Sequence, residues 1–294
     1  MPTRRRLLSA LASLPAWPAL AQSAGRLSHL GDGMHFGLVT YMWGADWDVP
    51  TLIEQCQRAK LDGVELRIEH AHGVHAGLDA AARREVRNRF EGSSVTILGM
   101  GTNCEFHSPQ KAEVEQQMAL ARQFIRLSHD IGGSGVKVKP NALPKGVAVE
   151  RTLEQIGNCL AQLGDEASGF GQEIRLEVHG GVTDLAQIAR IMEIANRDNV
   201  RVCWNSNDAD LKGSGIEANF AMVKAMLGST VHVRELDQPK YPFAKLIALL
   251  AAEDYAGWVL LEASSKPADR GAALAEQRRL FDQMLTQARR QLAS

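Results

Sequence analysis

The chain has 294 residues, with 33 Lys and Arg against 34 Asp and Glu, so its formal net charge is −1. This balance argues against nucleic-acid binding, which depends on a surplus of basic residues. Beyond the first residues, no stretch is apolar for long enough to anchor the chain in a bilayer, and no linker or low-complexity tract divides it. We therefore expect one folded domain.

Residues 1–21 have the pattern of an export signal. Arg4 to Arg6 precede a short apolar run from Leu7 to Leu20, and Ala21 ends a stretch of small residues suited to cleavage. The pattern resembles a twin-arginine signal, which predicts the twin-arginine export machinery as a partner and a periplasmic location. A membrane anchor is disfavoured because the run is short and contains two prolines. Cleavage would shift the formal net charge from −1 to −4, because the segment has three arginines and no acidic residue.

After an extension over residues 22–33, the segment 34–294 alternates between β-rich runs and amphipathic helical patterns. We expect strands at 35–41, 63–68, 95–100, 135–139, 174–180, 200–207, 230–236 and 257–264. Helices are expected at 49–59, 80–90, 111–131, 149–164, 184–196, 216–226, 243–252 and 272–292. Eight such repeats favour an α/β fold, a single (β/α)8 TIM barrel. The alternative is a doubly wound sheet, but the glycine-rich phosphate loop usual in that fold is missing.

The four cysteines are scattered and include no CxxC pair. Cys56 and Cys159 fall in helical patterns, and Cys203 falls in a strand. This distribution favours buried small hydrophobic residues over a zinc site or a disulfide framework, although a single disulfide stays open.

The second predicted strand and the loop after it carry polar residues. Glu65 and Arg67 alternate on one face of the strand and can form a buried ion pair. His70, His72 and His75 follow; a metal site is one interpretation, and a loop that contacts substrate or solvent is the other. Asn103, Glu105 and His107 follow the third strand, and Lys137 and Lys139 lie on the fourth. A lysine at a barrel mouth can hold an anionic or hydroxyl-rich ligand, or remain a solvated charge.

The last four predicted strands each end near one metal-capable side chain. Glu177, Asn205, His232 and Glu262 lie 28, 27 and 30 residues apart, the length of one βα repeat. In a parallel barrel the carboxyl ends of the strands open on one face, so these four side chains would converge. Together they suit one divalent ion, with Mn²⁺ the first choice and Mg²⁺, Co²⁺ or Zn²⁺ as alternatives. Each residue alone also fits an ordinary ion pair or a satisfied polar group.

Several short motifs carry a resemblance to a known family. GVELR at Gly63, EVHG at Glu177, CWNSND at Cys203, VHVREL at Val231 and LLEAS at Leu260 resemble the sugar phosphate isomerases and epimerases of the xylose isomerase-like TIM-barrel superfamily. In its ketose 3-epimerases a Glu, an Asp, a His and a second Glu on strands five to eight hold the metal. The resemblance implies these roles for Glu177, Asn205, His232 and Glu262. Asn205 departs from the pattern, because it supplies a neutral oxygen where the family has a carboxylate.

The resemblance also implies a reaction through an enediolate on a carbohydrate substrate. Glu177 and Glu262 would move the proton from opposite sides of the sugar, as general acid and base. His179 and Arg234 would orient substrate hydroxyls or the metal ligands. Together with Glu65, His72 and Lys139, they complete the set of residues expected to bind substrate.

Other functions remain open from the sequence. A metal-dependent lyase or hydrolase of keto-glycosides would use the same enediolate to expel a group from the β-carbon. A non-catalytic carbohydrate-binding barrel is another possibility, which Asn205 keeps open. An AP endonuclease shares the barrel, but it needs three zinc ions and a basic groove, which the net charge disfavours. Tyr241, Pro242 and Phe243 suit either a substrate wall or a contact in a homo-oligomer.

Overall fold

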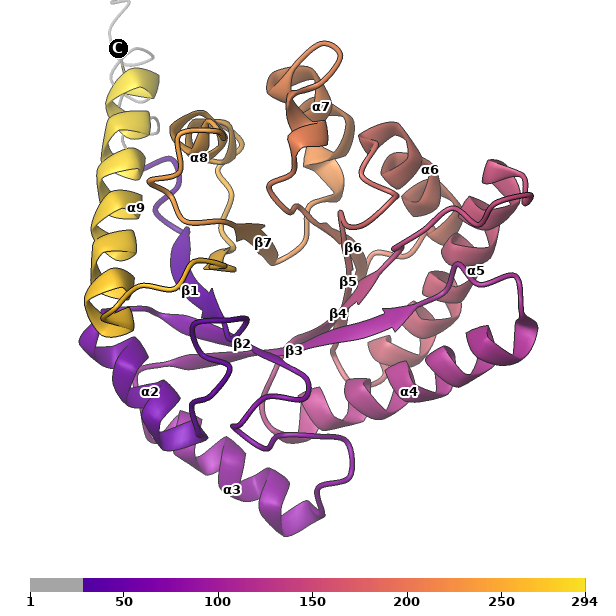
Figure 1. The fold of residues 1–294 in the computed structure, drawn as a ribbon, viewed down its shortest axis with the longest axis horizontal. Coiled ribbons are helices and arrows are strands. Elements are labelled where there is room, and N and C mark those ends of the chain that lie inside the picture. Colours follow the sequence, from indigo (N-terminus) through magenta and orange to yellow (C-terminus); the bar gives the residue numbers. More distant parts are fainter. Residues whose placement is uncertain (1–28, 294) are drawn as a thin grey trace, which may run out of the picture.

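The computed structural model describes residues 29–293. Eight parallel strands form a barrel, and helices surround it on the outside (Figure 1). The (β/α)8 prediction is confirmed. The predicted export signal lies outside the described residues and stays a prediction. Between residues 29 and 293, no helix has both the length and the apolar character needed to cross a membrane.

The elements follow the predicted order. The strands are β1 (His35–Val39), β2 (Gly63–Arg67), β3 (Thr96–Glu105), β4 (Gly135–Lys139), β5 (Glu173–Glu177), β6 (Val200–Cys203), β7 (Thr230–Val233) and β8 (Trp258–Leu261). The helices are α2 (Val49–Arg58), α3 (Ala80–Glu91), α4 (Lys111–Asp130), α5 (Val149–Ser168), α6 (Leu185–Ala195), α7 (Ile216–Val223), α8 (Phe243–Ala252) and α9 (Arg270–Ala293). Two short 3₁₀ turns, η1 (Asp208–Leu211) and η2 (Lys224–Met226), lie on either side of α7.

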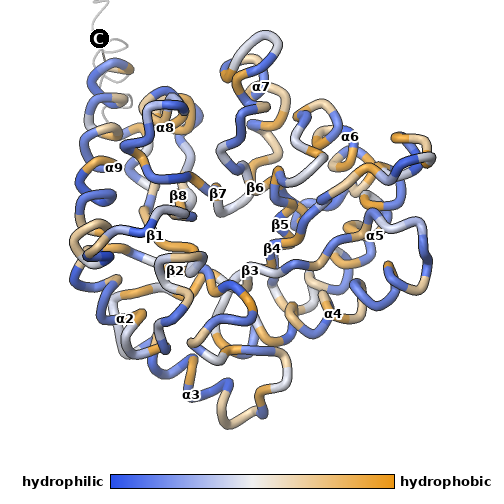
Figure 2. The backbone as a smooth tube through the Cα atoms, in the orientation of Figure 1, coloured by the Kyte–Doolittle hydropathy of each residue, from blue (hydrophilic) through white to orange (hydrophobic). Residues whose placement is uncertain are grey.

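Helices α2, α3 and α6 each begin at an aspartate that caps the first turn. The carboxylates of Asp48, Asp79 and Asp184 accept hydrogen bonds from backbone N–H groups two or three residues ahead. These N–H groups have no partner inside the helix, so a capping carboxylate fixes where the helix starts. Along each helix, hydrophobic and hydrophilic residues interchange at short spacing (Figure 2), as expected for helices that cover the barrel with one face.

β3 is longer than predicted and runs five residues further, to Glu105. Its pairing with β2 shifts between Val64 and Glu65, and Gly99 lies there with φ of +129°, a conformation that side chains other than glycine rarely adopt. Beyond this bulge, Glu105 pairs with Lys139 of β4. Asn103 and Glu105 therefore lie on a strand, and their prediction as loop residues is wrong.

Consecutive strands pair from β1 to β6, and β1 also pairs with β8, which pairs with β7. Only isolated bridges join β6 to β7, including one between Asn205 and His232. Backbone hydrogen bonds from His232 N to Trp204 O (2.6 Å) and from Ser206 N to His232 O (3.2 Å) close this side. A small number of backbone bonds therefore closes the barrel between β6 and β7, where the predicted metal ligands Asn205 and His232 lie.

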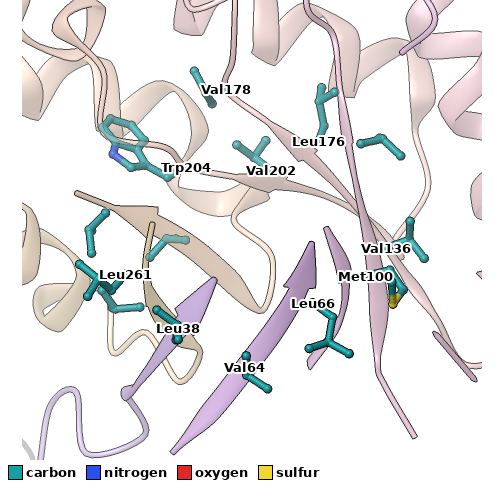
Figure 3. Packing of buried hydrophobic residues seen from close by; sticks show 14 of the residues in the cluster. Leu38, Val64, Leu66, Met100, Val136, Leu176, Val178, Val202, Trp204 and Leu261 are labelled. Atoms are coloured by element: carbon teal, nitrogen blue, oxygen red, sulfur yellow. The ribbon is translucent and has the colours of Figure 1, made fainter. Parts of the chain in front are cut away.

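Hydrophobic and polar side chains alternate along the strands, so the outer surface of the barrel is hydrophobic and its interior is polar. Leu66, Val136, Leu176 and Val202 belong to the buried core between strands and helices (Figure 3). Because successive side chains of a strand point to opposite faces, their neighbours point into the barrel. On those inward positions lie the buried side chains of Glu65, Lys137, Arg175, Glu177, Cys203 and His232. A barrel interior with this many ionisable groups needs mutual compensation.

All four cysteines are buried and free, so the prediction of small hydrophobic side chains is confirmed and no disulfide forms among them.

Candidate metal centre

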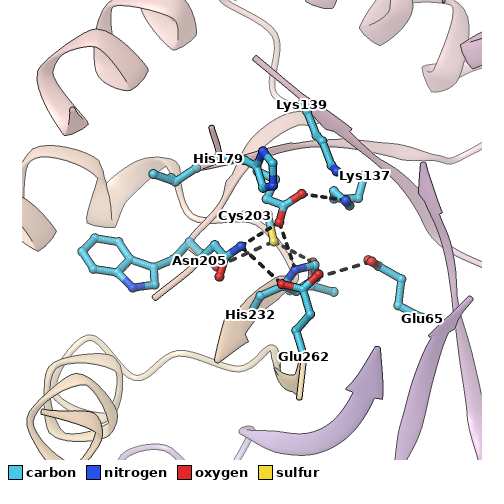
Figure 4. Close-up of polar contacts among 12 residues, drawn as sticks. Glu65, Lys137, Lys139, His179, Cys203, Asn205, His232 and Glu262 are labelled. Atoms are coloured by element: carbon cyan, nitrogen blue, oxygen red, sulfur yellow. Dashed lines mark hydrogen bonds and ion pairs between the residues drawn. The ribbon is translucent and has the colours of Figure 1, made fainter. Parts of the chain in front are cut away.

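The carboxyl ends of β5 to β8 bring the four predicted ligands together. Glu177 ends β5, Asn205 follows β6, His232 lies on β7 and Glu262 follows β8. All four side chains are buried. Figure 4 shows Asn205, His232 and Glu262 pointing toward one another. One ligand atom each of Glu177, His232 and Glu262 lies within 4.8 Å of the other two.

Asn205 links the two carboxylates. Its amide Nδ2 donates to Glu177 Oε1 at 2.7 Å and to Glu262 Oε2 at 3.4 Å. Its Oδ1 is buried and has no hydrogen-bond partner. A buried acceptor without a partner is rare in a folded protein and marks a place where a further group is expected.

Glu65 contacts His232 from the other side of the ring. Glu65 Oε1 lies 3.4 Å from His232 Nε2, and His232 Nδ1 lies 3.7 Å from Glu177 Oε1. Burial alone would raise the pKa of Glu65, but His232 and Lys137 outweigh it and leave the pKa below its ordinary value. A carboxylate that contacts one nitrogen of a histidine fixes the orientation of the ring and decides which nitrogen carries the proton. Glu65 contacts Nε2, so Nδ1 faces the centre. The predicted ion pair between Glu65 and Arg67 is therefore wrong, and the partner of Glu65 is His232.

Lys137 forms a fully buried ion pair with Glu177. Its ammonium Nζ lies 2.6 Å from Glu177 Oε2 and also donates to the Thr102 carbonyl at 3.3 Å. Burial would raise the pKa of Glu177, yet Lys137 and His232 hold it well below its ordinary value. Glu177 thus stays an anion.

Three of the residues predicted to bind substrate surround this centre. Lys139 Nζ donates to Asn103 Oδ1 at 3.0 Å, and His179 Nδ1 lies 3.1 Å from Asn141 Oδ1. Burial lowers the pKa of His179, which favours the neutral ring, although Glu177 opposes this. Arg234 donates from Nη1 to the backbone carbonyl of Glu262 at 3.2 Å, so it steadies the end of β8.

His72 serves the loop that carries it. Its Nδ1 accepts from Val74 N at 3.0 Å, so its Nε2 must carry the proton that bonds the Arg67 carbonyl at 2.8 Å. Both ring nitrogens are occupied, which leaves none for a substrate. His70 and His75 also bond locally, to Thr40 Oγ1 and to Gly77 N, so the three histidines do not form a metal site.

Residues 53–284 match the family model described as xylose isomerase-like TIM barrel. The chain belongs to this family. No curated protein sequence gave a match.

Solved structures of the same fold include several epimerases. An L-ribulose 3-epimerase has a TM-score of 0.76 at 18% identity, covering 88% of this chain and 96% of that one. A 3-keto-D-glucoside 4-epimerase from E. coli has a TM-score of 0.72 at 13% identity, covering 85% and 99%. The IOLI protein, solved with a zinc atom, has a TM-score of 0.72 at 15% identity, covering 86% and 99%. At these identities, the likeness shows the fold.

The family member described here has a donor set that fits one divalent ion. Two carboxylates and an imidazole nitrogen converge. Asn205 turns its amide Nδ2 toward the two carboxylates, and its Oδ1 and both nitrogens of His232 are buried without hydrogen-bond partners. A cation between Glu177, His232 and Glu262 would satisfy His232 Nδ1, and Asn205 would bind it through Oδ1 after its amide group turned over. Burial would lower the pKa of His232, but Cys203, Glu65 and Glu177 outweigh it and raise the pKa well above its ordinary value, so the ring would have to give up a proton to bind the ion. The carboxylates of Glu65, Glu177 and Glu262, the Lys137 ammonium, a neutral imidazole and a divalent ion would then sum to zero charge. Within residues 29–293, this is the group of side chains that could hold a metal ion. It does not match the three-metal cluster of an AP endonuclease.

Sequence analysis missed the part that Lys137 plays in this centre. The sequence held a signal for this role, because valine and lysine alternate in GVKVK. This alternation places Lys137 on the same inward face of the strand as Lys139. The pairing with Glu177 required the register of β4 against β5, where Lys137 aligns with Arg175 and Val138 with Leu176. Arg67 was also placed with the wrong partner.

Proposed function

We propose that this protein is a metal-dependent sugar isomerase or epimerase. The proposal rests on two buried carboxylates, Glu177 and Glu262. Together with His232 they form a group that could hold one cation at the mouth of a barrel of this family. Solved relatives of the fold named as ribulose and keto-glucoside epimerases support the same class. The proposed substrate is a ketose or a related carbohydrate.

Glu177, Asn205, His232 and Glu262 would hold the ion. When bound, it would polarise a sugar carbonyl and make the neighbouring C–H more acidic. Glu262 would take the proton from the sugar. Lys137 and His232 keep the pKa of Glu177 well below its ordinary value, so Glu177 is an anion until a proton reaches it. Glu177 would take a proton from solvent and give it to the opposite face of the sugar, while Glu262 would release the proton it has taken to solvent. Return to the same carbon gives an epimer, and return to the adjacent carbon gives an isomer.

His179 and Lys139 lie beside these carboxylates and would orient the hydroxyls of the sugar. His179 is half-buried and its pKa is lowered by burial, so a neutral ring can both donate and accept. A non-catalytic barrel would not need the Lys137 and Asn205 contacts that keep Glu177 anionic between two donors.

The test is deuterium incorporation from solvent into the carbon next to the carbonyl of ketoses and keto-glycosides. We expect incorporation by the wild type, and a rate at least about 100-fold lower in Glu177→Gln and in Glu262→Gln, the usual size of a general acid or base contribution. Metal content is measured on each variant. Full metal content with full turnover in both variants would refute the acid and base roles. Loss of a β-substituent without reprotonation would indicate the keto-glycoside lyase instead.

A further inference from the structure

Two cations from different strands converge on one neutral oxygen near the metal centre. Arg67 ends β2 and Lys139 ends β4, and these strands flank β3. Arg67 Nη1 donates to Asn103 Oδ1 at 3.1 Å, and Lys139 Nζ donates to the same atom at 3.0 Å. Asn103 lies on β3 and is exposed, so the place where the two charges meet is open to solvent.

No carboxylate within residues 29–293 forms an ion pair with either cation. The guanidinium of Arg67 otherwise contacts the Thr102 carbonyl at 3.5 Å and the ring of Tyr41, 5.8 Å from its centroid. Its Nε is buried without a hydrogen-bond partner. Burial lowers the pKa of Lys139, and Lys137 and Arg67 lower it further. Two neighbouring positive charges with one neutral acceptor between them are stabilised by an anion.

The backbone that carries Arg67 is fixed before any ligand arrives. Arg67 N donates to Thr40 Oγ1 at 2.9 Å, and the Arg67 carbonyl accepts from His72 Nε2 at 2.8 Å. A guanidinium on a fixed strand end loses little freedom when it binds, which favours a specific contact with an oxyanion.

The pair also adjoins the metal centre. The charges of Glu177 and Glu262 both act on Lys139, and they oppose the lowering of its pKa. Figure 4 shows Lys139 reaching toward Lys137, next to His179. A sugar whose carbonyl faces Glu177 and Glu262 would therefore extend its far end toward Lys139 and Arg67.

We propose that Arg67, Lys139 and Asn103 form an oxyanion clamp that binds a carboxylate or phosphate group on the sugar substrate. The clamp rests on the proposed function for the location of the sugar, and it narrows the substrate class to acidic carbohydrates. Lys139 was expected to contact substrate from the sequence alone, whereas Arg67 and Asn103 are assigned by the geometry.

The test is calorimetric titration of the Mn²⁺-loaded protein with three matched ketoses. D-fructose, D-fructuronate and D-fructose 6-phosphate carry a hydroxymethyl group, a carboxylate and a phosphate at the same end. We expect one acidic ligand to bind at least about tenfold tighter than fructose, and the tighter one distinguishes carboxylate from phosphate. The double variant Arg67→Gln/Lys139→Gln should lower that affinity roughly 100-fold, about tenfold for each lost charged hydrogen bond.

The matched control is Arg84→Gln/Arg126→Gln, which removes two exposed arginines from α3 and α4. It should retain the preference for the acidic ligand. Lys139→Gln alone, at a half-buried side chain, serves if the double variant folds poorly, and Lys139→Arg should restore the preference. Equal or tighter binding of fructose, no measurable binding of either acid, or a preference that survives in the clamp variants would overturn the clamp. Deuterium exchange is measured separately from binding. The clamp can therefore fail while the proposed reaction is supported, and the proposed reaction can fail while the clamp is supported.

Discussion

Asn205 and Lys137 together determine the charge around Glu177. One donates a neutral amide N–H to Oε1, and the other places an ammonium 2.6 Å from Oε2. A carboxylate at position 205 would add a negative charge next to Glu177 and Glu262. With a divalent ion bound, the present set of groups is neutral, which is the favourable state for a buried site.

The variant Asn205→Asp tests whether this residue is a ligand. We expect the affinity for Mn²⁺ to rise, because a third carboxylate among the ligands attracts the cation more strongly and ligand charge tunes cation affinity. Calorimetric titration of the metal-free protein with Mn²⁺ measures the change, with Asn158→Asp at an exposed position of α5 as the control. Unchanged affinity in Asn205→Asp would show that Asn205 is not a ligand.

At the scale of the element, β3 makes space for the residue that holds His232. A Cβ on Gly101 would lie 2.6 Å from Glu65 Oε1 and 3.1 Å from Arg67 Cδ. Glu65 is fully buried against His232 and has no room to retreat. The glycine therefore allows the second-strand carboxylate to reach the histidine of the seventh strand.

We expect Gly101→Ala to destabilise the fold by about 1–3 kcal/mol, the usual cost of overpacking, and to weaken metal binding by displacing Glu65. Chemical unfolding and metal titration measure the two effects. Gly181→Ala is the matched control, because the nearest atom to its added Cβ lies at an ordinary 3.5 Å. If the two variants behave alike, Gly101 has no special role in placing Glu65.

The sequence was sufficient for the elements and for bringing four side chains together, and insufficient for contacts across strands. The βα spacing predicted all eight strands and the proximity of Glu177, Asn205, His232 and Glu262, because these depend on local periodicity. Their role as metal ligands stays a prediction. The partners of Glu65 and Arg67 depend on the bulge in β3 and on register, which no local pattern encodes. For the same reason, the sequence did not reveal that both nitrogens of His72 are occupied by its own loop.

At the scale of the whole molecule, a buried acid makes stability depend on pH. Asp210 in η1 accepts from Tyr241 Oη at 2.6 Å and from Asn207 N at 2.9 Å, through the same Oδ2. Burial raises its pKa to about 7, so the folded protein keeps this proton where the unfolded chain has lost it. Asp210 therefore contributes less stability as the pH rises from about 4 to about 7.

The variant Asp210→Asn should remove this dependence. Its oxygen can keep the two donors, and its amide nitrogen can replace Oδ1, which has no hydrogen-bond partner. The difference in free energy of unfolding between variant and wild type should therefore shift in favour of the variant between pH 4 and pH 7. Chemical unfolding at several pH values measures it, and a difference that stays constant across this range would contradict the assignment.

The proposed reaction depends on one divalent ion at the carboxyl ends of β5 to β8. The most direct measurement is elemental analysis of the purified protein, beside Glu262→Ala and the control Glu54→Ala, which removes an exposed carboxylate from α2. We predict one divalent ion per chain in the wild type and in the control, and its loss in Glu262→Ala. If neither the wild type nor the control holds a stoichiometric metal, the four-ligand centre is wrong, and a non-catalytic carbohydrate-binding barrel becomes the better description.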